Sequence, residues 1–406
     1  MINDKLIRKR TVAFGGARKA PAALGPTLLP SPMQPSAMQP PALIEPTWLA
    51  ARTAALFAAC GLPQDAAETV AAALVDADLR GIPSHGTLLA PMYAERLRRG
   101  SVSTATRAQV VVDAGALAVL DAGHALGILT ADQAIALAIE KARAHGLGAV
   151  TVRRAFHFGG GFRYVQTAAA AGMVGIAAAN TRPLMPAPGG ARARVGNNPL
   201  AIGVPRAGGD PLVLDMALSE AALGKIRLAA AEGREIPPTW ATDREGSPTT
   251  DAEAAIAGLL LPAAGHKGYG LALMVDVLCG VLSGGAFGAA VNGLYADTSV
   301  PNDCAHFFLA LDAARCFGGD PEPFAQRVAQ LAGEVVQPPA APGVDRLMVP
   351  GQPEAERHAR ASREGIAVAS STLDALARAC GEAGIELGEP ALAATAAPAT
   401  TGEAPR

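Results

Sequence analysis

The stretch Ala149-Val-Thr-Val-Arg-Arg-Ala-Phe-His157-Phe-Gly-Gly-Gly161 places a histidine and three glycines directly after a run rich in β-branched residues. The run predicts a buried strand, because β-branched side chains favour extended backbone. Glycines let the backbone approach a ligand and leave N–H groups available, and a histidine exchanges protons near neutral pH. The stretch therefore predicts an acid–base residue delivered to a ligand site. The alternative is a turn that needs glycine only for its backbone angles.

A second histidine lies in Ser84-His85-Gly86, in a predicted loop between two helices. Ser84 can orient the imidazole of His85 for general acid–base catalysis. The same tripeptide also fits a helix cap with a hydrogen-bonded histidine. We expect the fold to bring the two histidine loops together at one site.

The hydrophobic pattern changes several times along the chain. Helical patterns between 47 and 100 give way to a predicted hairpin at 110–112 and 118–120, and then to an amphipathic helix at 128–145 that Gly146 ends. Beyond it, predicted strands at 150–152, 174–178, 200–204, 212–214 and 307–311 alternate with helices. Helical patterns at 322–334, 353–364 and 373–383 complete the fold. The pattern predicts a mixed α and β protein.

Composition excludes several classes of function. The 34 basic and 36 acidic residues give a net charge of −2, so no basic surface for nucleic acid is predicted. Five scattered cysteines without a CxxC predict reduced thiols in a cytoplasmic protein. The longest apolar run, 269–288, contains Asp276 and five glycines, and it predicts a buried helix rather than a membrane span.

Both ends of the chain have the composition of disordered tails. Residues 1–45 are rich in proline, and residues 389–406 are rich in alanine, proline and threonine. The basic N-terminus lacks the apolar segment of a secretory signal. The sequence leaves open whether translation starts at Met1 or at Met33 or Met38.

Two further motifs suit a phosphate or a ribose. In Ala264-Gly-His-Lys-Gly-Tyr-Gly270, Lys267 and backbone N–H groups precede a long apolar pattern and suit a phosphate, although the spacing matches neither a P-loop nor GxGxxG. Asp215 ends a strand pattern and fits either a ribose contact or a cap of the next helix. Lys225 fits a solvated surface. No spacing of metal ligands and no GxSxG nucleophile motif is present, so neither a metal site nor a serine hydrolase is predicted.

Ten separated motifs together resemble the malate/L-lactate dehydrogenase family, which is unrelated to the Rossmann-fold lactate and malate dehydrogenases. That family includes ureidoglycolate and sulfolactate dehydrogenases and cyclic-imine carboxylate reductases. The motifs occur in one order between about 47 and 385: Asp78-Leu-Arg-Gly-Ile-Pro-Ser-His-Gly86, His157-Phe-Gly159, Pro188-Gly-Gly190, Gly196-Asn-Asn-Pro-Leu-Ala201, Leu214-Asp-Met-Ala217, Gly224-Lys225, Ile236-Pro-Pro-Thr-Trp240, Pro248-Thr-Thr-Asp251, Leu261-Pro-Ala-Ala-Gly-His-Lys-Gly-Tyr-Gly-Leu271 and Pro350-Gly351.

The resemblance implies an α/β (α+β) fold whose NAD(P)-binding domain is not of the Rossmann type. That domain contains a largely antiparallel sheet, and a helical lobe is formed from both chain ends. We therefore predict a cofactor- and substrate-binding domain at 109–320, between lobe segments at 46–108 and 321–388. The resemblance also implies NAD or NADP as cofactor, a small-molecule substrate and a homodimer, with no nucleic-acid or membrane partner.

The resemblance assigns roles to individual residues. His85 and His157 are the acid–base candidates, with Ser84 beside the first, and the sequence does not decide between the two histidines. The cofactor contacts fall on Thr181, Asp215, Met216, Ala217, Lys225, His266, Lys267 and Gly268. The substrate candidates are Tyr93, Asn197 and Arg154. Neither NAD nor NADP is preferred by the sequence.

Two positions depart from the family pattern. Where the family commonly has an arginine for the substrate carboxylate, three residues beyond Gly86, this chain has Leu89, which cannot form a charge-assisted bidentate contact. Either Arg154, Arg163 or Arg182 replaces that arginine, or the substrate is less acidic. The threonine that often precedes Asn-Pro is Asn197 here.

These residues predict reversible hydride transfer between NAD(P) and C2 of a small 2-hydroxy or 2-oxo acid, with a histidine as proton donor or acceptor. Two alternatives remain open. The first is reduction of a cyclic imine carboxylate by the reduced cofactor. The second is a catalytically lapsed relative that binds the cofactor without turnover.

Overall fold

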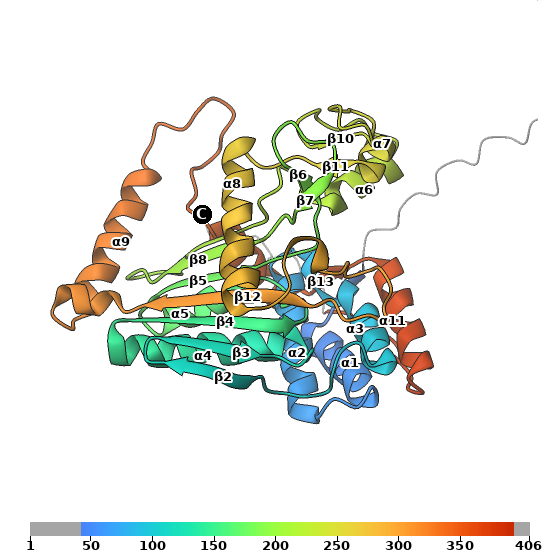
Figure 1. Ribbon diagram of the computed structural model, residues 1–406, viewed down its shortest axis with the longest axis horizontal. Coiled ribbons are helices and arrows are strands. Elements are labelled where there is room, and N and C mark those ends of the chain that lie inside the picture. The colour runs from blue at the N-terminus through green and yellow to red at the C-terminus, as the bar shows by residue number, and fades with distance from the viewer. Residues whose placement is uncertain (1–41, 394–406) are drawn as a thin grey trace, which may run out of the picture. The chain divides into compact units, whose positions relative to one another are not determined.

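The computed structural model describes residues 42–393, drawn in colour in Figure 1. The tail predictions for residues 1–41 and 394–406 lie outside the described residues. Residues 42–45 and 389–393, which were also predicted as tail, are instead ordered. Strand β1 (Ala42–Ile44) pairs with β13 (Ile366–Val368), and Leu392 forms a bridge with Ile44. The tail boundaries were wrong because this backbone pairing links distant segments and leaves little local signal.

A seven-stranded sheet with the order β2-β3-β4-β12-β5-β8-β9 organises the described chain (Figure 1). Only β3 and β4 run parallel, and every other neighbouring pair is antiparallel. The prediction of a mixed fold with a largely antiparallel sheet is confirmed. The strands are β2 (Gln109–Ala114), β3 (Leu117–Asp121), β4 (Leu147–Ala155), β5 (Val174–Ala179), β8 (Leu200–Val204), β9 (Leu212–Met216) and β12 (Cys304–Leu311).

Strand β12 lies between β4 and β5, so the last strand of this sheet along the chain occupies its middle. Successive side chains of a strand point to opposite faces. Accordingly Phe308 packs with Ile135 of α4 (Gly127–His145), whereas Phe307 packs with Val275 of α8 (His266–Asp276). Helix α5 (Phe162–Ala170) contacts β5 and β8. The predicted helix at 128–145 and its end at Gly146, which has φ 90°, are confirmed.

Helix α8 continues through a π-helical segment, η3 (Val277–Val281), and crosses in front of the sheet in Figure 1. The prediction that this run forms a buried helix was wrong for one of its sides. Ala272, Val275 and Cys279 pack on the sheet, but a second stripe is 38–51% exposed: Leu271, Leu273, Met274, Val277, Leu278, Val281 and Leu282. The run is apolar all round, and the sheet covers only one side of it.

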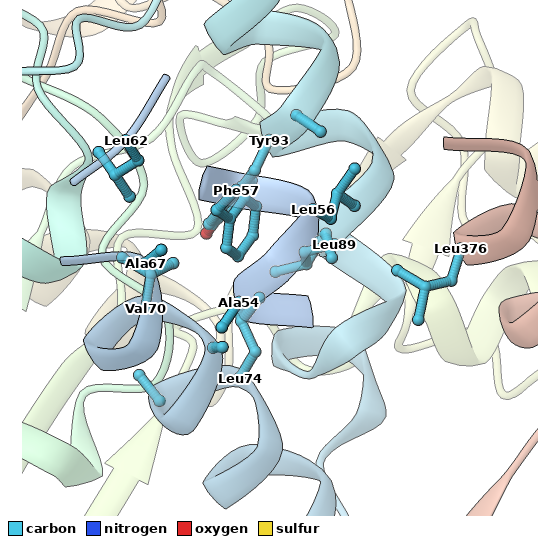
Figure 2. Packing of buried hydrophobic residues seen from close by; sticks show 14 of the residues in the cluster. Ala54, Leu56, Phe57, Leu62, Ala67, Val70, Leu74, Leu89, Tyr93 and Leu376 are labelled. Carbon is cyan, nitrogen blue, oxygen red and sulfur yellow. The ribbon is translucent and has the colours of Figure 1, made fainter. Parts of the chain in front are cut away.

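Helices from both ends of the described chain share one hydrophobic cluster. It joins α1 (Pro46–Ala59), α2 (Gln64–Leu79) and α3 (Ala90–Arg99) with α11 (Ser370–Glu382), while α10 (Gln352–Glu364) contacts α2. Figure 2 shows Leu376 of α11 near Leu56 and Leu89 in this cluster. Helix α9 (Glu322–Val335) instead contacts η5 (Ala313–Phe317), at a distance from these helices in Figure 1.

Short elements complete the described chain. Strand β10 contacts the small helix α7, which in turn packs on the small helix α6. The elements are the single turns η1 (Pro83–His85), η2 (Thr87–Leu89) and η4 (Gly288–Ala290), the helices α6 (Leu223–Ala231) and α7 (Ala252–Ala257), and the two-stranded pairs β6 (Met185–Pro186) with β7 (Ala193–Val195) and β10 (Ala241–Thr242) with β11 (Leu259–Leu260). Within residues 42–393, none of the helices combines the length and apolarity needed to cross a bilayer.

Candidate active site

The structure brings His85 and His157 together. His85 ends the single turn η1 between α2 and α3, and His157 follows the end of β4. Their rings are stacked with centroids 5.5 Å apart and an interplanar angle of 30°. The two histidine loops therefore meet at one site, although α3, the β2–β3 hairpin and α4 separate them along the chain.

Each imidazole has a hydroxyl partner at Nδ1. Ser84 Oγ lies 3.0 Å from Nδ1 of His85, and the hydroxyl of Tyr93 lies 2.6 Å from Nδ1 of His157. Neither Nε2 has a hydrogen-bond partner among the described residues. Because a hydroxyl can donate or accept, each Nδ1 contact supports either neutral tautomer of its ring. Both Nε2 atoms are therefore available to exchange a proton with a substrate.

Tyr93 is fully buried, and packing fixes its position. Its ring meets that of Phe156 edge-on, with centroids 5.0 Å apart, and also contacts Phe57 in the helical cluster of Figure 2. The sequence predicted Tyr93 as a substrate contact. The observed contact of its hydroxyl is with His157, which it orients.

Asp78 holds the loop that carries His85. Its carboxylate accepts hydrogen bonds from the backbone N–H of Thr87, at 2.8 Å, and from the Thr87 hydroxyl, at 2.7 Å. Burial raises the pKa of Asp78 to about 6, although both Thr87 contacts act in the opposite direction. The backbone after His85 is thus tied to α2.

The surroundings keep both imidazoles neutral. The pKa of His157 is lowered to about 3, first by burial and then by the charges of His85 and His306. Burial also lowers the pKa of His85. His306 lies behind the site on β12, fully buried and stacked on Phe158 at 4.8 Å, and burial lowers its pKa to about 3. At neutral pH the site therefore presents uncharged rings.

A direct test follows from these shifts. We expect the imidazoles of His157 and His306 to stay neutral from about pH 8 to about pH 5, whereas an ordinary histidine titrates near 6.5. Histidine ¹³C NMR measures this, with His157→Gln and His306→Gln assigning the signals among the seven histidines. Because the unfolded rings bind protons first, stability should fall as pH drops from about 6.5 towards about 3. A midpoint between pH 6 and 7 for His157 would contradict the prediction.

The glycines after His157 serve packing. A Cβ on Gly161 would lie 2.8 Å from Cβ of Ala201. The N–H of Phe162 donates to Asp215 at 2.8 Å, so that this carboxylate caps the start of α5. Although part of Asp215 reaches solvent, the protein around its carboxyl desolvates it and raises its pKa to about 6. The N–H of Phe162 is therefore used within the protein. The cap predicted for Asp215 was assigned to the wrong helix: Asp215 caps α5, which precedes it along the chain, whereas the next helix, α6, has no side-chain cap.

The segments predicted to contact the cofactor converge next to the histidine loop. Thr181 Oγ1 donates to Asn197 at 3.0 Å, and Leu218, which follows Ala217, donates its N–H to the Asn197 carbonyl at 2.8 Å. Ala263 in turn donates its N–H to the carbonyl of Leu218 at 3.0 Å. These contacts bring together the neighbourhoods of Thr181, Asp215, Met216, Ala217, His266, Lys267 and Gly268, while Lys225 lies exposed on α6.

The start of α8 fits the diphosphate of a dinucleotide. Gly265 has φ 64° and open space where a side chain would be, and the helix has no side-chain cap. The N–H groups of His266, Lys267 and Gly268 have no recorded partner within the described residues, and the Lys267 side chain is exposed. Unpaired N–H groups and a lysine at a helix N-terminus attract phosphate oxygens. The residues present therefore fit NAD or NADP.

The remaining substrate candidates have partners of their own. Arg154 Nε donates to Asp121 at 2.7 Å, and Arg154 has φ 47°, which is uncommon for a residue with a side chain. Asn197 is bonded to Thr181. Leu89 is 1% exposed and points into the helical cluster.

Arg96 was missed by the sequence analysis. Its fully buried guanidinium donates to the carbonyls of Gly293, Leu294 and Val300, and to Ser101. It thereby fixes the 291–303 segment, which leads into β12. The available signal was a charged residue on the inward face of α3, one turn after Tyr93.

Comparisons with known proteins identify the family. Residues 44–377 match the family described as Malate/L-lactate dehydrogenase. The chain belongs to this family. Among curated relatives, ureidoglycolate dehydrogenase (NAD(+)) of Escherichia coli (strain K12) is 37% identical over 308 residues, covering 76% of this chain and 87% of the relative.

Solved structures share the fold. Sulfolactate dehydrogenase from Methanocaldococcus jannaschii has a TM-score of 0.80 and 32% identity, covering 85% of this chain and 98% of that one. The Δ1-piperideine-2-carboxylate reductase from Pseudomonas syringae pv. tomato has a TM-score of 0.74 and 29% identity, covering 83% and 99%. Curated members of the family are named for NAD(+) or NADP(+). The chain is accordingly an NAD(P)-dependent dehydrogenase that acts on CH–OH groups.

Proposed function

We propose that this protein catalyses reversible hydride transfer between NAD(P) and C2 of a small 2-hydroxy or 2-oxo acid. The observation that carries the proposal is the stacked pair His85 and His157, with Tyr93 bonded to His157, beside the segments that fit the cofactor. Curated relatives named for ureidoglycolate, sulfolactate and malate support this substrate class.

In this mechanism Nε2 of His157 removes the hydroxyl proton during oxidation and returns it during reduction. The bound nicotinamide ring supplies the hydride acceptor or donor. Tyr93 holds the His157 ring through Nδ1: its hydroxyl oxygen accepts from Nδ1–H in both directions, which leaves Nε2 free to take or return the proton. A neutral imidazole is the form that can accept the proton, and the lowered pKa of His157 keeps it in that form.

His85, held by Ser84, has a separate role in the proposal. Its ring lies against that of His157, where it limits water access and lowers the pKa of His157. The start of α8, with His266, Lys267 and Gly268, binds the diphosphate. Thr181, Asp215, Met216, Ala217 and Lys225 complete the cofactor site. Positioning both reactants over one another supplies much of the rate.

A second candidate reaction is reduction of a cyclic imine carboxylate. The structural similarity to the Δ1-piperideine-2-carboxylate reductase favours it. The same hydride geometry and the same proton donor would serve, because C=N replaces C=O at the reacting carbon.

A substrate panel tests the proposal. The protein is assayed at 340 nm with both cofactors against malate, lactate, ureidoglycolate and sulfolactate, against the matching 2-oxo acids, and against Δ1-piperideine-2-carboxylate. Turnover of a hydroxy or oxo acid that His157→Ala loses supports the main proposal, and turnover of the imine alone supports the second candidate. Binding of reduced cofactor without turnover of any compound would refute both and would favour a lapsed enzyme.

We also propose the wider arrangement that the family resemblance implied. The sheet with its flanking helices forms a cofactor domain that is not of the Rossmann type. Helices α1, α2 and α3 with α10 and α11 form a separate lobe, whereas α9, predicted as part of that lobe, packs on η5. A cytoplasmic location is proposed because all five cysteines, each within the described residues, are free.

A homodimer is proposed because the outer face of α8 and η3 presents a continuous apolar stripe. Exposed apolar patches of this kind mark interfaces between proteins. We expect the wild-type protein to be a dimer and Met274→Glu with Val281→Glu, both 51% exposed, to yield monomers by light scattering after gel filtration. Val112→Glu on β2, 46% exposed, is the control that should stay dimeric. A monomeric wild-type protein or a dimeric double variant would contradict the prediction.

A further inference from the structure

Leu89 stands where the family commonly has an arginine, so a substrate carboxylate at this site would need another cation. Two of the three candidate arginines already bind a carboxylate, although Arg154 shares Asp121 with Arg153. Arg163 forms two parallel bonds to Asp132, at 2.9 and 2.7 Å, and Arg154 is bonded to Asp121 at 2.7 Å. Within residues 42–393 the Arg182 guanidinium makes no such bond to a carboxylate. Arg182 therefore keeps its donors for a ligand.

The topology places Arg182 at the same end of the sheet as His157. Strands β4 and β5 both pair antiparallel with β12, so β4 and β5 point the same way and their C-terminal ends lie at the same end of the sheet. His157 follows the first of these ends, and Arg182 follows the second. The two side chains therefore belong to loops separated by the width of one strand.

The 291–303 segment packs against Arg182 and is held by α3. A Cβ on Gly293 would lie 3.0 Å from Cδ of Arg182, so the arginine side chain passes directly over this glycine. The Gly293 carbonyl accepts a bond from Arg96 at 3.2 Å, one helical turn from Tyr93. Arg182 is therefore packed on a segment that is itself tied to the helix orienting His157.

A second uncompensated cation lies nearby. The pKa of Arg182 is lowered, first by desolvation and then by the positive charge of Arg227 on α6. Arg227 also lowers the pKa of Tyr295 in the 291–303 segment, although burial raises that pKa overall. Arg227, like Arg182, has no carboxylate partner among the described residues. Two neighbouring guanidinium groups without an acid favour the binding of an anion.

We propose that Arg182 binds the carboxylate of the substrate and that Arg227 adds positive charge behind it. This inference rests on the proposed function, and it decides between the two consequences of Leu89: the substrate is a free acid, bound by a different arginine. In this proposal the acid lies at the C-terminal ends of β4 and β5. Its carboxylate contacts Arg182 and its C2 oxygen contacts His157. A planar guanidinium that contacts both carboxylate oxygens also fixes the orientation of C2.

The test measures carboxylate binding and turnover separately. Calorimetry with saturating NADH or NADPH measures the affinity for malonate and oxamate, two unreactive carboxylates, in the wild-type protein, Arg182→Gln, Arg182→Lys and Arg107→Gln. Arg107 is exposed before β2, at the far edge of the sheet, and serves as the control. We expect Arg182→Gln to weaken binding about 10- to 100-fold, Arg182→Lys to weaken it less, and Arg107→Gln to leave it unchanged.

Turnover gives an independent readout. In Arg182→Gln we expect KM for the best acid of the panel to rise by about the same factor, with a smaller effect on kcat, and the preference for the acid over its methyl ester to disappear. Unchanged carboxylate affinity in Arg182→Gln, or a wild-type protein that binds neither probe, would overturn the inference. Carboxylate binding that depends on Arg182, without turnover of any substrate, would instead refute the proposed function.

Discussion

Replacing His157 with alanine is expected to lower kcat by about 10²-fold or more and to leave the affinity for reduced cofactor unchanged. The substitution removes the only group in the proposed mechanism that exchanges a proton with the substrate oxygen. Hydride transfer would then have to generate a high-energy alkoxide or depend on water. Steady-state rates at 340 nm give kcat, and quenching of protein fluorescence by NADH or NADPH gives the cofactor affinity.

Three further variants separate the proton-transfer role from packing. Tyr93→Phe removes only the hydroxyl bonded to His157 and should lower kcat about tenfold with little change in KM, because the ring loses its orientation. His85→Ala should have a smaller effect than His157→Ala. His145→Ala, exposed at the end of α4, should be silent. If His157→Ala retained a near-wild-type rate, the assignment of His157 as the acid–base residue would be wrong, whatever the rate of His85→Ala.

Local patterns predicted much of the framework around these histidines. The β-branched run before His157 is strand β4, and the amphipathic stretch that Gly146 ends is helix α4. Both signals are periodic and need only neighbouring residues. The contact between Tyr93 and His157 is different, because it depends on how α3 packs against the end of β4. The helical period of α3 indicates that Tyr93 faces inward, but it cannot identify the partner.

The misses have the same physical origin. The outer side of α8 has the same apolar composition as the side that packs on the sheet, so the sequence alone gave no reason to expect exposure. Arg96 looked like one more charged helix residue, and its role depends on carbonyls some 200 positions away in the sequence. Strand β1 pairs with β13 near the other end of the chain. Each miss depends on which distant segments pack together, or fail to cover a surface, and this carries no local periodicity.

A glycine that no motif singled out leads to the second large effect. Gly127 begins α4, and a Cβ there would lie 1.8 Å from the carbonyl oxygen of Phe156 and 2.5 Å from that of His157. Those oxygens belong to the backbone that positions the catalytic imidazole. An alanine at this point forces either α4 or the His157 loop to move. Alanine should therefore damage stability and catalysis together.

Gly127→Ala is expected to lower the free energy of unfolding by about 1–3 kcal/mol and to reduce kcat. The sign is informative, because alanine for glycine within a helix otherwise stabilises by about 1 kcal/mol. Gly381→Ala in α11 has no atom within 4 Å of the added methyl and should show that ordinary stabilisation. Urea unfolding of both variants measures the difference. A Gly127→Ala protein as stable and active as the wild type would contradict the prediction. It would show that the backbone of Phe156 and His157 can shift without loss of stability, and that its packing against α4 does not hold His157 in place.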